Sequence, residues 1–228
     1  MRILDLFCGA GGAAMGLHRV WPEAEIFGVD IKWQPRYPFR FIQADLAPMT
    51  FNLNLNFEIF DFIWASPPCQ RYTQMLNHGL TDRLNHPDYI AEVRHRLQRS
   101  GRPWVIENVP HAPLLNPVML CGEMFGLHVT RHRLLEASFP LVQPEHPKHR
   151  GTHTRKQGDG GYYYRVYGHE TGKASWGKAM GIDWMRSPEL AQAVPPAYSE
   201  WIARQVNGSG WAFPAEPEAI GGSEGERR

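Results

Sequence analysis

Residues 1–12 read MRILDLFCGAGG, and this stretch decides the fold of the chain. Its first residues form a short apolar run that ends in Asp5, Leu6 and Phe7, which predicts a buried strand. The glycines at positions 9, 11 and 12 permit the tight turn and the close backbone approach that a bound nucleotide requires. A run of small and apolar residues then continues to Val20 and predicts a helix. This order is typical of the start of a nucleotide-binding α/β domain.

The alternation of strands and helices continues outward from this turn. Further strands are predicted at residues 25–30, 39–44, 60–65 and 104–109, and a helix at residues 87–99. We therefore predict an α/β fold with a doubly wound, mainly parallel sheet, in which ligands bind at the carboxyl ends of the strands.

The second half of the chain has a weaker pattern. Residues 127–136 are predicted as a strand or half of a hairpin, and residues 196–206 as a closing helix. Residues 144–178 are polar and rich in Gly, His and Tyr, with an excess of four positive charges. We predict a small irregular insertion at residues 136–179 and a flexible tail at residues 207–228.

Composition is that of a soluble globular protein, with 43% hydrophobic residues and a net charge of +1. No apolar run approaches the roughly 18 residues that span a bilayer, and the start does not resemble a signal peptide. Cys8, Cys69 and Cys121 are too far apart for a disulfide framework or a CxxC metal pair, which favours a reducing cytoplasm. If the partner is a nucleic acid, positive charge must be concentrated locally.

The glycine turn and two acids indicate a cofactor site. The turn lacks the spacing of the dinucleotide fingerprint, so a cofactor without a pyrophosphate is favoured. Asp30 ends the second predicted strand, where an acid can accept hydrogen bonds from ribose hydroxyls. Asp45 follows the third strand and can accept from an adenine amino group. Taken singly, the turn can be a tight turn only and each acid a helix cap; together and in this order they favour an adenosine site.

The fourth predicted strand is followed by Ala65-Ser66-Pro67-Pro68-Cys69-Gln70. The two prolines fix the backbone and hold the Cys69 side chain in one place, which suits a nucleophile. A single cysteine is more often a small buried apolar residue. The motifs elsewhere in the chain decide between these readings.

Three motifs resemble, in order and spacing, the signature motifs of DNA cytosine carbon-5 methyltransferases: residues 5–12, the run Pro67-Pro68-Cys69-Gln70, and Glu107-Asn108-Val109. Arg131-His132-Arg133 resembles that family's pair of arginines one residue apart, and residues 191–196 resemble its last motif. The resemblance implies a Rossmann-like fold dependent on S-adenosylmethionine, with a catalytic domain at residues 1–135 and 180–206.

The resemblance also implies a mechanism. Cys69 attacks carbon 6 of a cytosine flipped into the pocket and thereby activates carbon 5 for methylation. Glu107 holds or protonates ring nitrogen 3, a role that asks for a carboxyl whose pKa is raised by a dry pocket. Arg131 and Arg133 grip the base carbonyl and a phosphate, although both can also be solvated charges on an edge strand. Asn108 orders the Glu107 loop.

Other residues carry over by position. Those expected to contact the cofactor are Phe7, Cys8, Gly9, Gly11, Asp30, Ile31, Asp45, Leu46, Pro67, Gln192 and Val194. Cys8 is thus expected in the pocket wall and Cys121 in the core. Residues expected to contact the substrate are Ser66, Pro68, Gln70, Asn108, Lys148, Arg150, Arg155, Lys156, Tyr163 and Arg165. No metal is expected: His146, His149 and His153 lack a fourth ligand spaced nearby, and solvent exposure explains them.

The chain departs from the family in its recognition region. Only about forty-five residues separate Leu135 from Lys178, where the family has often a hundred or more. A segment this short can supply phosphate contacts and tyrosines that stack on bases, or be a solvated loop. Gln192 stands where the last motif has an asparagine, and Ser66, Tyr72 and Thr73 are unusual around the nucleophile.

Three hypotheses follow. The first is a cytoplasmic, monomeric enzyme that methylates carbon 5 of cytosine in DNA at a short or relaxed site, as would suit a phage or another mobile element. The second is the same chemistry on a free pyrimidine nucleotide, single-stranded DNA or RNA, or with a variant cofactor group. The third is a nucleic-acid-binding protein of this fold without turnover, against which the intact set of catalytic residues argues.

Overall fold

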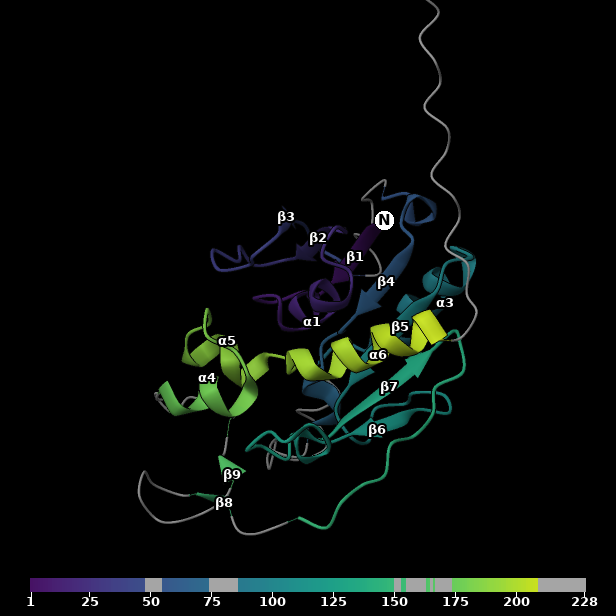
Figure 1. Ribbon diagram of the computed structural model, residues 1–228. Coiled ribbons are helices and arrows are strands. Elements are labelled where there is room, and N and C mark those ends of the chain that lie inside the picture. The colour runs from purple at the N-terminus through teal and green to yellow at the C-terminus, as the bar shows by residue number, and fades with distance from the viewer. Residues whose placement is uncertain are drawn as a thin grey trace, which may run out of the picture.

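A seven-stranded sheet forms the centre of the computed structural model, which describes residues 1–47, 55–73, 86–149, 153–154, 163–164, 166 and 174–208 (Figure 1). The strand order is β3-β2-β1-β4-β5-β7-β6. Its strands are β1 (Arg2–Leu6), β2 (Glu25–Asp30), β3 (Arg40–Gln43), β4 (Phe62–Ala65), β5 (Trp104–Asn108), β6 (Val118–Leu120) and β7 (Arg133–Ala137).

The first five strands of the sheet pair in parallel, and β7 alone runs antiparallel to its neighbours β5 and β6. This arrangement confirms the predicted doubly wound, mainly parallel sheet. The predicted strands all exist, and the ends of the parallel strands differ by at most two residues; the strand predicted at residues 127–136 begins only at Arg133. β6 was not predicted, because three residues among prolines carry too little alternation.

Helices cover both faces of the sheet. They are α1 (Gly12–Val20), α3 (Ile90–Arg99), α4 (Ala174–Met180), α5 (Ser187–Gln192) and α6 (Pro196–Gly208), with short 3-10 turns η1 (Phe57–Ile59), η2 (Gln70–Tyr72) and η3 (Gly122–Phe125). α1 and α6 lie on the near face in Figure 1. Alternate strand residues serve the two faces: Ile3 and Trp64 pack with α1 and α6, whereas Leu4 and Ile63 pack with α3.

Two glycines let the last helix lie directly on the first. A Cβ at Gly12 would stand 2.2 Å from the Val194 carbonyl oxygen, and one at Gly16 would stand 2.0 Å from that of Pro196. Neither position has room for a side chain, and the Ser199 hydroxyl donates to the Ala13 carbonyl at 2.7 Å. The residues of the last motif are thereby held against the first glycine turn.

A third apolar cluster lies outside the sheet. Trp176 and Met180 of α4 pack with Val129, Val166 and Leu190. Part of the segment expected to be an irregular insertion therefore has a small core of its own, which the polar composition of residues 144–178 concealed. The parallel pair β8 (His153–Thr154) and β9 (Tyr163–Tyr164) lies beside it. In the part of the chain that the structure describes, no helix has the length and apolar character needed to cross a membrane.

Candidate active site

A cleft of about 1030 Å³ opens at the carboxyl ends of β1, β2, β4 and β5. It is lined by Phe7, Cys8, Gly9, Asp30, Ile31, Asp45, Leu46, Pro67, Gln192 and Val194, which were all expected to contact a cofactor. The same cleft is lined by Ser66, Pro68, Cys69, Gln70, Glu107, Arg131 and Arg133. Residues from seven separate stretches of sequence thus share one continuous space. Gly11 does not line it; this residue starts α1 with a φ of 85° and packs on Pro38.

Backbone amides fix the acid at the end of β2. One carboxylate oxygen of Asp30 accepts from the Gly9 amide and the other from the Lys32 amide, both at 3.0 Å. Each oxygen keeps a second lone pair for a ligand hydroxyl. A Cβ built at Gly9 would meet no protein atom within 4 Å, so the space beside this turn is free for a ligand. The turn and the acid therefore form one side of a nucleoside-sized site.

The two cysteines of the cleft have different surroundings. Cys8 is 8% exposed, and burial followed by the nearby Asp5 and Asp30 carboxylates raises the pKa of its thiol far above the usual range. It stays protonated and cannot act as a nucleophile at neutral pH. Cys69 is only half-buried and lies near the guanidinium of Arg131.

The turn that presents Cys69 is held from two sides. The Asn108 side-chain amide donates to the Pro67 carbonyl at 2.9 Å from a buried position. The Thr73 hydroxyl and the Tyr72 amide both donate to the Cys69 carbonyl, at 3.0 and 2.9 Å. Asn108 does not line the cleft. Its position fits an ordering residue, but one that orders the Cys69 turn as well as its own strand end.

Glu107 is the buried acid of the reacting end. It is 5% exposed, and its carboxylate forms an ion pair with the Arg133 guanidinium at 2.8 Å and a hydrogen bond with the Ser66 side chain. Burial nevertheless raises the pKa of Glu107, against the opposing effect of Arg133. The carboxyl therefore has the raised pKa that proton donation to a ring nitrogen asks for.

The two arginines of the double-arginine motif have separate tasks. The Arg131 guanidinium donates to three backbone carbonyls, those of Ala193 at 2.8 Å, Ala191 at 2.8 Å and Val166 at 2.9 Å. Burial and the neighbouring Arg133 lower the pKa of Arg131 to about 9, so that it remains charged at neutral pH. Most of the Arg131 N–H groups are thus used inside the protein, whereas Arg133 forms the direct ion pair with Glu107.

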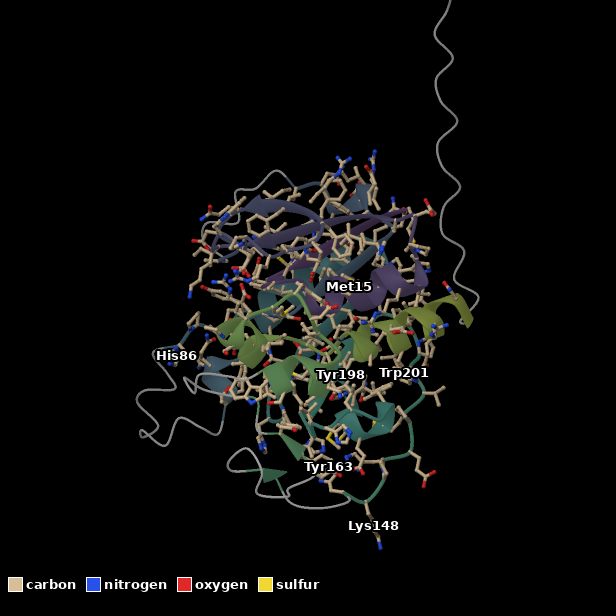
Figure 2. All side chains as sticks on the ribbon, turned by 60° about the vertical axis from the view of Figure 1, so that its left-hand side comes forward. Met15, His86, Lys148, Tyr163, Tyr198 and Trp201 are labelled. Carbon is tan, nitrogen blue, oxygen red and sulfur yellow. The ribbon has the colours of Figure 1, made fainter. Side chains whose placement is uncertain are left out.

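Lys148 and Tyr163, the expected substrate residues of the second half that the structure describes, do not line the cleft. Lys148 is exposed, and Figure 2 shows it pointing outward at the lower edge of the molecule. Tyr163 is fully buried, with its hydroxyl donating to the Glu123 carboxylate. A buried ring has no free face for a base, which corrects the prediction for Tyr163. Arg150, Arg155, Lys156 and Arg165 lie outside the described residues.

Sequence reasoning missed several contributors to the site. The Trp184 indole donates to the Ala10 carbonyl at 2.9 Å, from a loop with no motif. Tyr89 lines the cleft, with its ring centroid 6.2 Å from that of Phe7. The buried Tyr198 hydroxyl, near the middle of the view in Figure 2, donates to the Arg131 carbonyl at 2.9 Å. Only Tyr198 had a signal, as part of the apolar face of the closing helix.

Comparison with known proteins agrees with this geometry. The model of the C-5 cytosine-specific DNA methylases matches residues 1–111, the part of the chain from β1 to the end of β5. The strand order, with β7 antiparallel, is that of the Rossmann-like fold of S-adenosylmethionine-dependent methyltransferases, and residues 1–111 are similar to the C-5 cytosine-specific DNA methylases.

Relatives and solved structures cover only part of the chain. A human (Homo sapiens) tRNA (cytosine(38)-C(5))-methyltransferase is 29% identical over 119 residues, 48% of this chain and 30% of the human enzyme. A DNMT2 variant from Spodoptera frugiperda is similar over 64% of this chain and 53% of its own, with 20% identity and a TM-score of 0.43. A methyltransferase of Entamoeba histolytica is similar over 64% of this chain and 57% of its own, with 16% identity and a TM-score of 0.42. The chain spans 30% of the human relative's length.

The cofactor of this family is S-adenosylmethionine, and the residues of the cleft fit it. The free space at Gly9 and the carboxylates of Asp30 and Asp45 offer a place for an adenosine, and no glycine-rich pyrophosphate cradle is needed. Pro67, two residues before Cys69 in the sequence, lines the same cleft as these cofactor-side residues. When bound, the cofactor supplies an electrophilic methyl group.

Proposed function

We propose that the protein methylates carbon 5 of cytosine in DNA, with Cys69 as the nucleophile. One observation carries the proposal: Cys69, Glu107 and Arg133 line the same cleft as the cofactor-side residues Gly9 and Asp30. Without a cofactor site beside it, Cys69 would be one thiol in a stiff turn.

The chemistry explains each of these residue types. Carbon 5 of cytosine is a poor nucleophile, and addition of the Cys69 thiolate to carbon 6 makes the ring electron-rich. Glu107, in its protonated form, donates its proton toward ring nitrogen 3 as the thiolate adds. Arg133 orients the Glu107 carboxyl through their 2.8 Å contact. Once carbon 5 carries the methyl group, its proton passes to water, Cys69 leaves as a thiolate and ring nitrogen 3 returns its proton to Glu107, which restores the aromatic ring.

Substitution of Cys69 tests the mechanism directly. Cys69→Ala is expected to lower methyl transfer by roughly a thousandfold or more, since removal of a nucleophile removes the covalent step. Binding of S-adenosylmethionine should persist, measured by calorimetry. An oligonucleotide carrying 5-fluorocytosine should form a covalent adduct with the unaltered chain and not with the variant. The control His95→Ala, which alters an exposed residue of α3, should still form the adduct. Turnover by Cys69→Ala would exclude the mechanism.

RNA is the second candidate substrate, because the human relative is a tRNA methyltransferase. The same cleft chemistry serves either polymer, since both present a cytosine ring. Tritium transfer to duplex DNA, single-stranded DNA, tRNA and cytidine monophosphate, measured side by side, separates them. We expect the highest kcat/KM on DNA. A hundredfold preference for tRNA would transfer the proposal to RNA without affecting the role of Cys69.

A further inference from the structure

Four metal-binding side chains meet beside the double-arginine motif. Cys121 Sγ and one ring nitrogen each from His132, His146 and His149 all lie within 4.8 Å of one another. The three imidazole rings have centroids 5.1 to 5.2 Å apart. We propose that these four residues form a structural zinc site.

The register of two strands brings the first two ligands together. In the antiparallel pair of β6 and β7, Leu120 faces Arg133, so that the next pair along is Cys121 and His132. The Gly122 amide donates to the Thr130 carbonyl at 2.8 Å and extends this pairing. A Cβ at Gly122 would lie 2.1 Å from the Val129 carbonyl oxygen, so the close approach requires glycine. Cys121 and His132 are thus placed by the sheet itself.

The other two ligands arrive on the segment that follows β7. The Gln143 side chain accepts from the Met119 amide at 2.7 Å and donates to the Met119 carbonyl at 2.8 Å. This pair of bonds fastens the returning chain along β6 three residues before His146. His146 and His149 then reach the end of the β6–β7 pair, where Cys121 and His132 lie.

The separations suit tetrahedral zinc. With Zn–N near 2.05 Å and Zn–S near 2.3 Å, tetrahedral ligands stand about 3.3 Å apart for two nitrogens and about 3.6 Å apart for sulfur and nitrogen. His132 Nε2 lies 3.0 Å from His146 Nε2, and Cys121 Sγ lies 3.5 Å from His149 Nε2. Only shifts of a few tenths of an ångström separate these distances from a coordination shell.

Hydrogen bonding prepares His146 as a ligand. Its Nδ1 lies 2.9 Å from the Pro147 carbonyl, which can only accept, so the proton sits on Nδ1. Its Nε2, which lies 3.0 Å from His132 Nε2, is then the ring nitrogen that faces the other ligand atoms. Metal-bound histidines ordinarily have their second nitrogen engaged in this way.

The chemistry of the donors selects the ion. Three imidazoles and one thiolate suit a borderline-soft ion that prefers tetrahedral coordination, which is zinc. Four protein ligands close the shell, so the site is structural and not catalytic. The sequence analysis expected no metal because the nearby histidines had no fourth ligand; Cys121 and His132 supply two ligands from far along the chain.

A zinc ion at this place would fasten the segment after β7 to the strand of the catalytic arginines. His132 stands between Arg131 and Arg133, and the Arg133 guanidinium donates to the His132 carbonyl at 2.8 Å. The position of Arg133 against Glu107 is therefore coupled to the metal. The proposal does not depend on the substrate or on methyl transfer.

The test uses the full chain without a histidine tag and zinc alone as the probe. The protein is stripped with a chelator and titrated with Zn²⁺ against a chromophoric competitor; we expect one equivalent to bind and the Tm to rise. Co²⁺ in its place should give the thiolate charge-transfer band and the intense visible bands of tetrahedral coordination. Failure to take up one equivalent of Zn²⁺, or cobalt spectra without thiolate, would overturn the proposal.

Variants separate this site from adventitious binding. His146→Ala and His149→Ala alter exposed residues and should fold, yet we expect zinc affinity to fall at least roughly a hundredfold in each. Cys121→Ser should remove the cobalt charge-transfer band. His95→Ala, which alters an exposed histidine of α3, should bind zinc as the unaltered chain does. If His95→Ala and His146→Ala bind zinc with the same affinity, whether that affinity is high or low, the assignment of His146 as a ligand is wrong.

Discussion

At the cofactor end of the cleft, the groups that hold the site are close together in the sequence, whereas at the reacting end they come from distant parts of the chain. The Asp30 carboxylate is fixed by the backbone amides of Gly9 and Lys32. All three residues belong to the first 32 of the chain and follow or end the strands β1 and β2. Arg131, by contrast, is fixed by carbonyls up to 62 residues away. The first end is therefore encoded locally and the second by the tertiary structure.

This difference predicts different responses to substitution. At the cofactor end, the effect of a substitution on the free energy of unfolding should depend mainly on charge buried near the glycine turn. The side chains there lie in a tightly packed strand end. At the second end, loss of one guanidinium or amide should loosen elements that are far apart in sequence. Four substitutions test the contrast.

Asp5→Asn is expected to have the largest effect on stability. Asp5 is 1% exposed, and burial raises its pKa from 3.8 to about 8, with Tyr37 donating a hydrogen bond at 3.2 Å. The unfolded chain loses this proton at a much lower pH, so the free energy of unfolding falls as pH rises from about 4 to about 8. Asn keeps the acceptor without the charge. The variant should gain several kcal/mol at pH 8 and little at pH 4.

Urea denaturation at several pH values measures this gain. The exposed Asp183→Asn serves as the control and should follow the unaltered chain at every pH. A gain for Asp5→Asn that is the same at pH 4 and pH 8 would show that Asp5 is not protonated in the folded state.

Arg131→Lys should come next, with a loss of about 3 kcal/mol in the free energy of unfolding. Lysine keeps the positive charge but cannot reach three divergent carbonyls with one ammonium group. Chemical denaturation measures the loss. The matched variant Arg133→Lys, whose contact with Glu107 is a single ion pair, should lose less. The reverse order would mean that Arg133 and not Arg131 fastens the last motif.

Arg133→Ala should lower kcat by roughly thirtyfold, equivalent to about 2 kcal/mol. It should also move one limb of the pH profile. Arg133 lowers the pKa of Glu107, so its removal should raise that pKa further and shift the limb that reports Glu107 to higher pH. The exposed Arg99→Ala should leave the profile in place. If the pH profile of Arg133→Ala is not shifted, its limb does not report the protonation of Glu107.

Asn108→Ala should have the smallest effect, about a tenfold loss of kcat with little change in KM. The variant loses the bond to the Pro67 carbonyl, which fixes the Cys69 turn, and the bond that the Asn108 side-chain oxygen accepts from the Val109 amide; neither touches a ligand. Steady-state kinetics together with the Tm measure it. A tenfold rise in KM instead would show that Asn108 takes part in substrate binding.

The sequence predicted the parallel half of the sheet because local patterns determine it. Strand β2 was predicted with the observed ends, and the glycine turn after β1 lies where the motif placed it. The cleft gathers the predicted residues Cys69, Glu107 and Asp30 because parallel strands carry their carboxyl ends to one edge.

The second half escaped prediction because its contacts are long-range. Tyr163 looked like a base-stacking residue in a polar run, but the packing around Glu123 and His149 buries it. Cys121 matched no motif, and only the pairing of β6 with β7 sets it beside His132. A three-residue strand gives no periodicity from which such a pairing can be read.

The contact of α6 with α1 also sets the order in which the protein can fold. Ser199 and Ala13, which are hydrogen-bonded, lie 186 residues apart, so a ribosome finishes the covering helix long after the strands beneath it. Until then the near face of the sheet, with Phe62 and Trp64, lacks half of its cover. Nascent chains halted before Pro196 should therefore expose this apolar face, and residues 191–194 of the cleft are fastened against α1 only once α6 has docked.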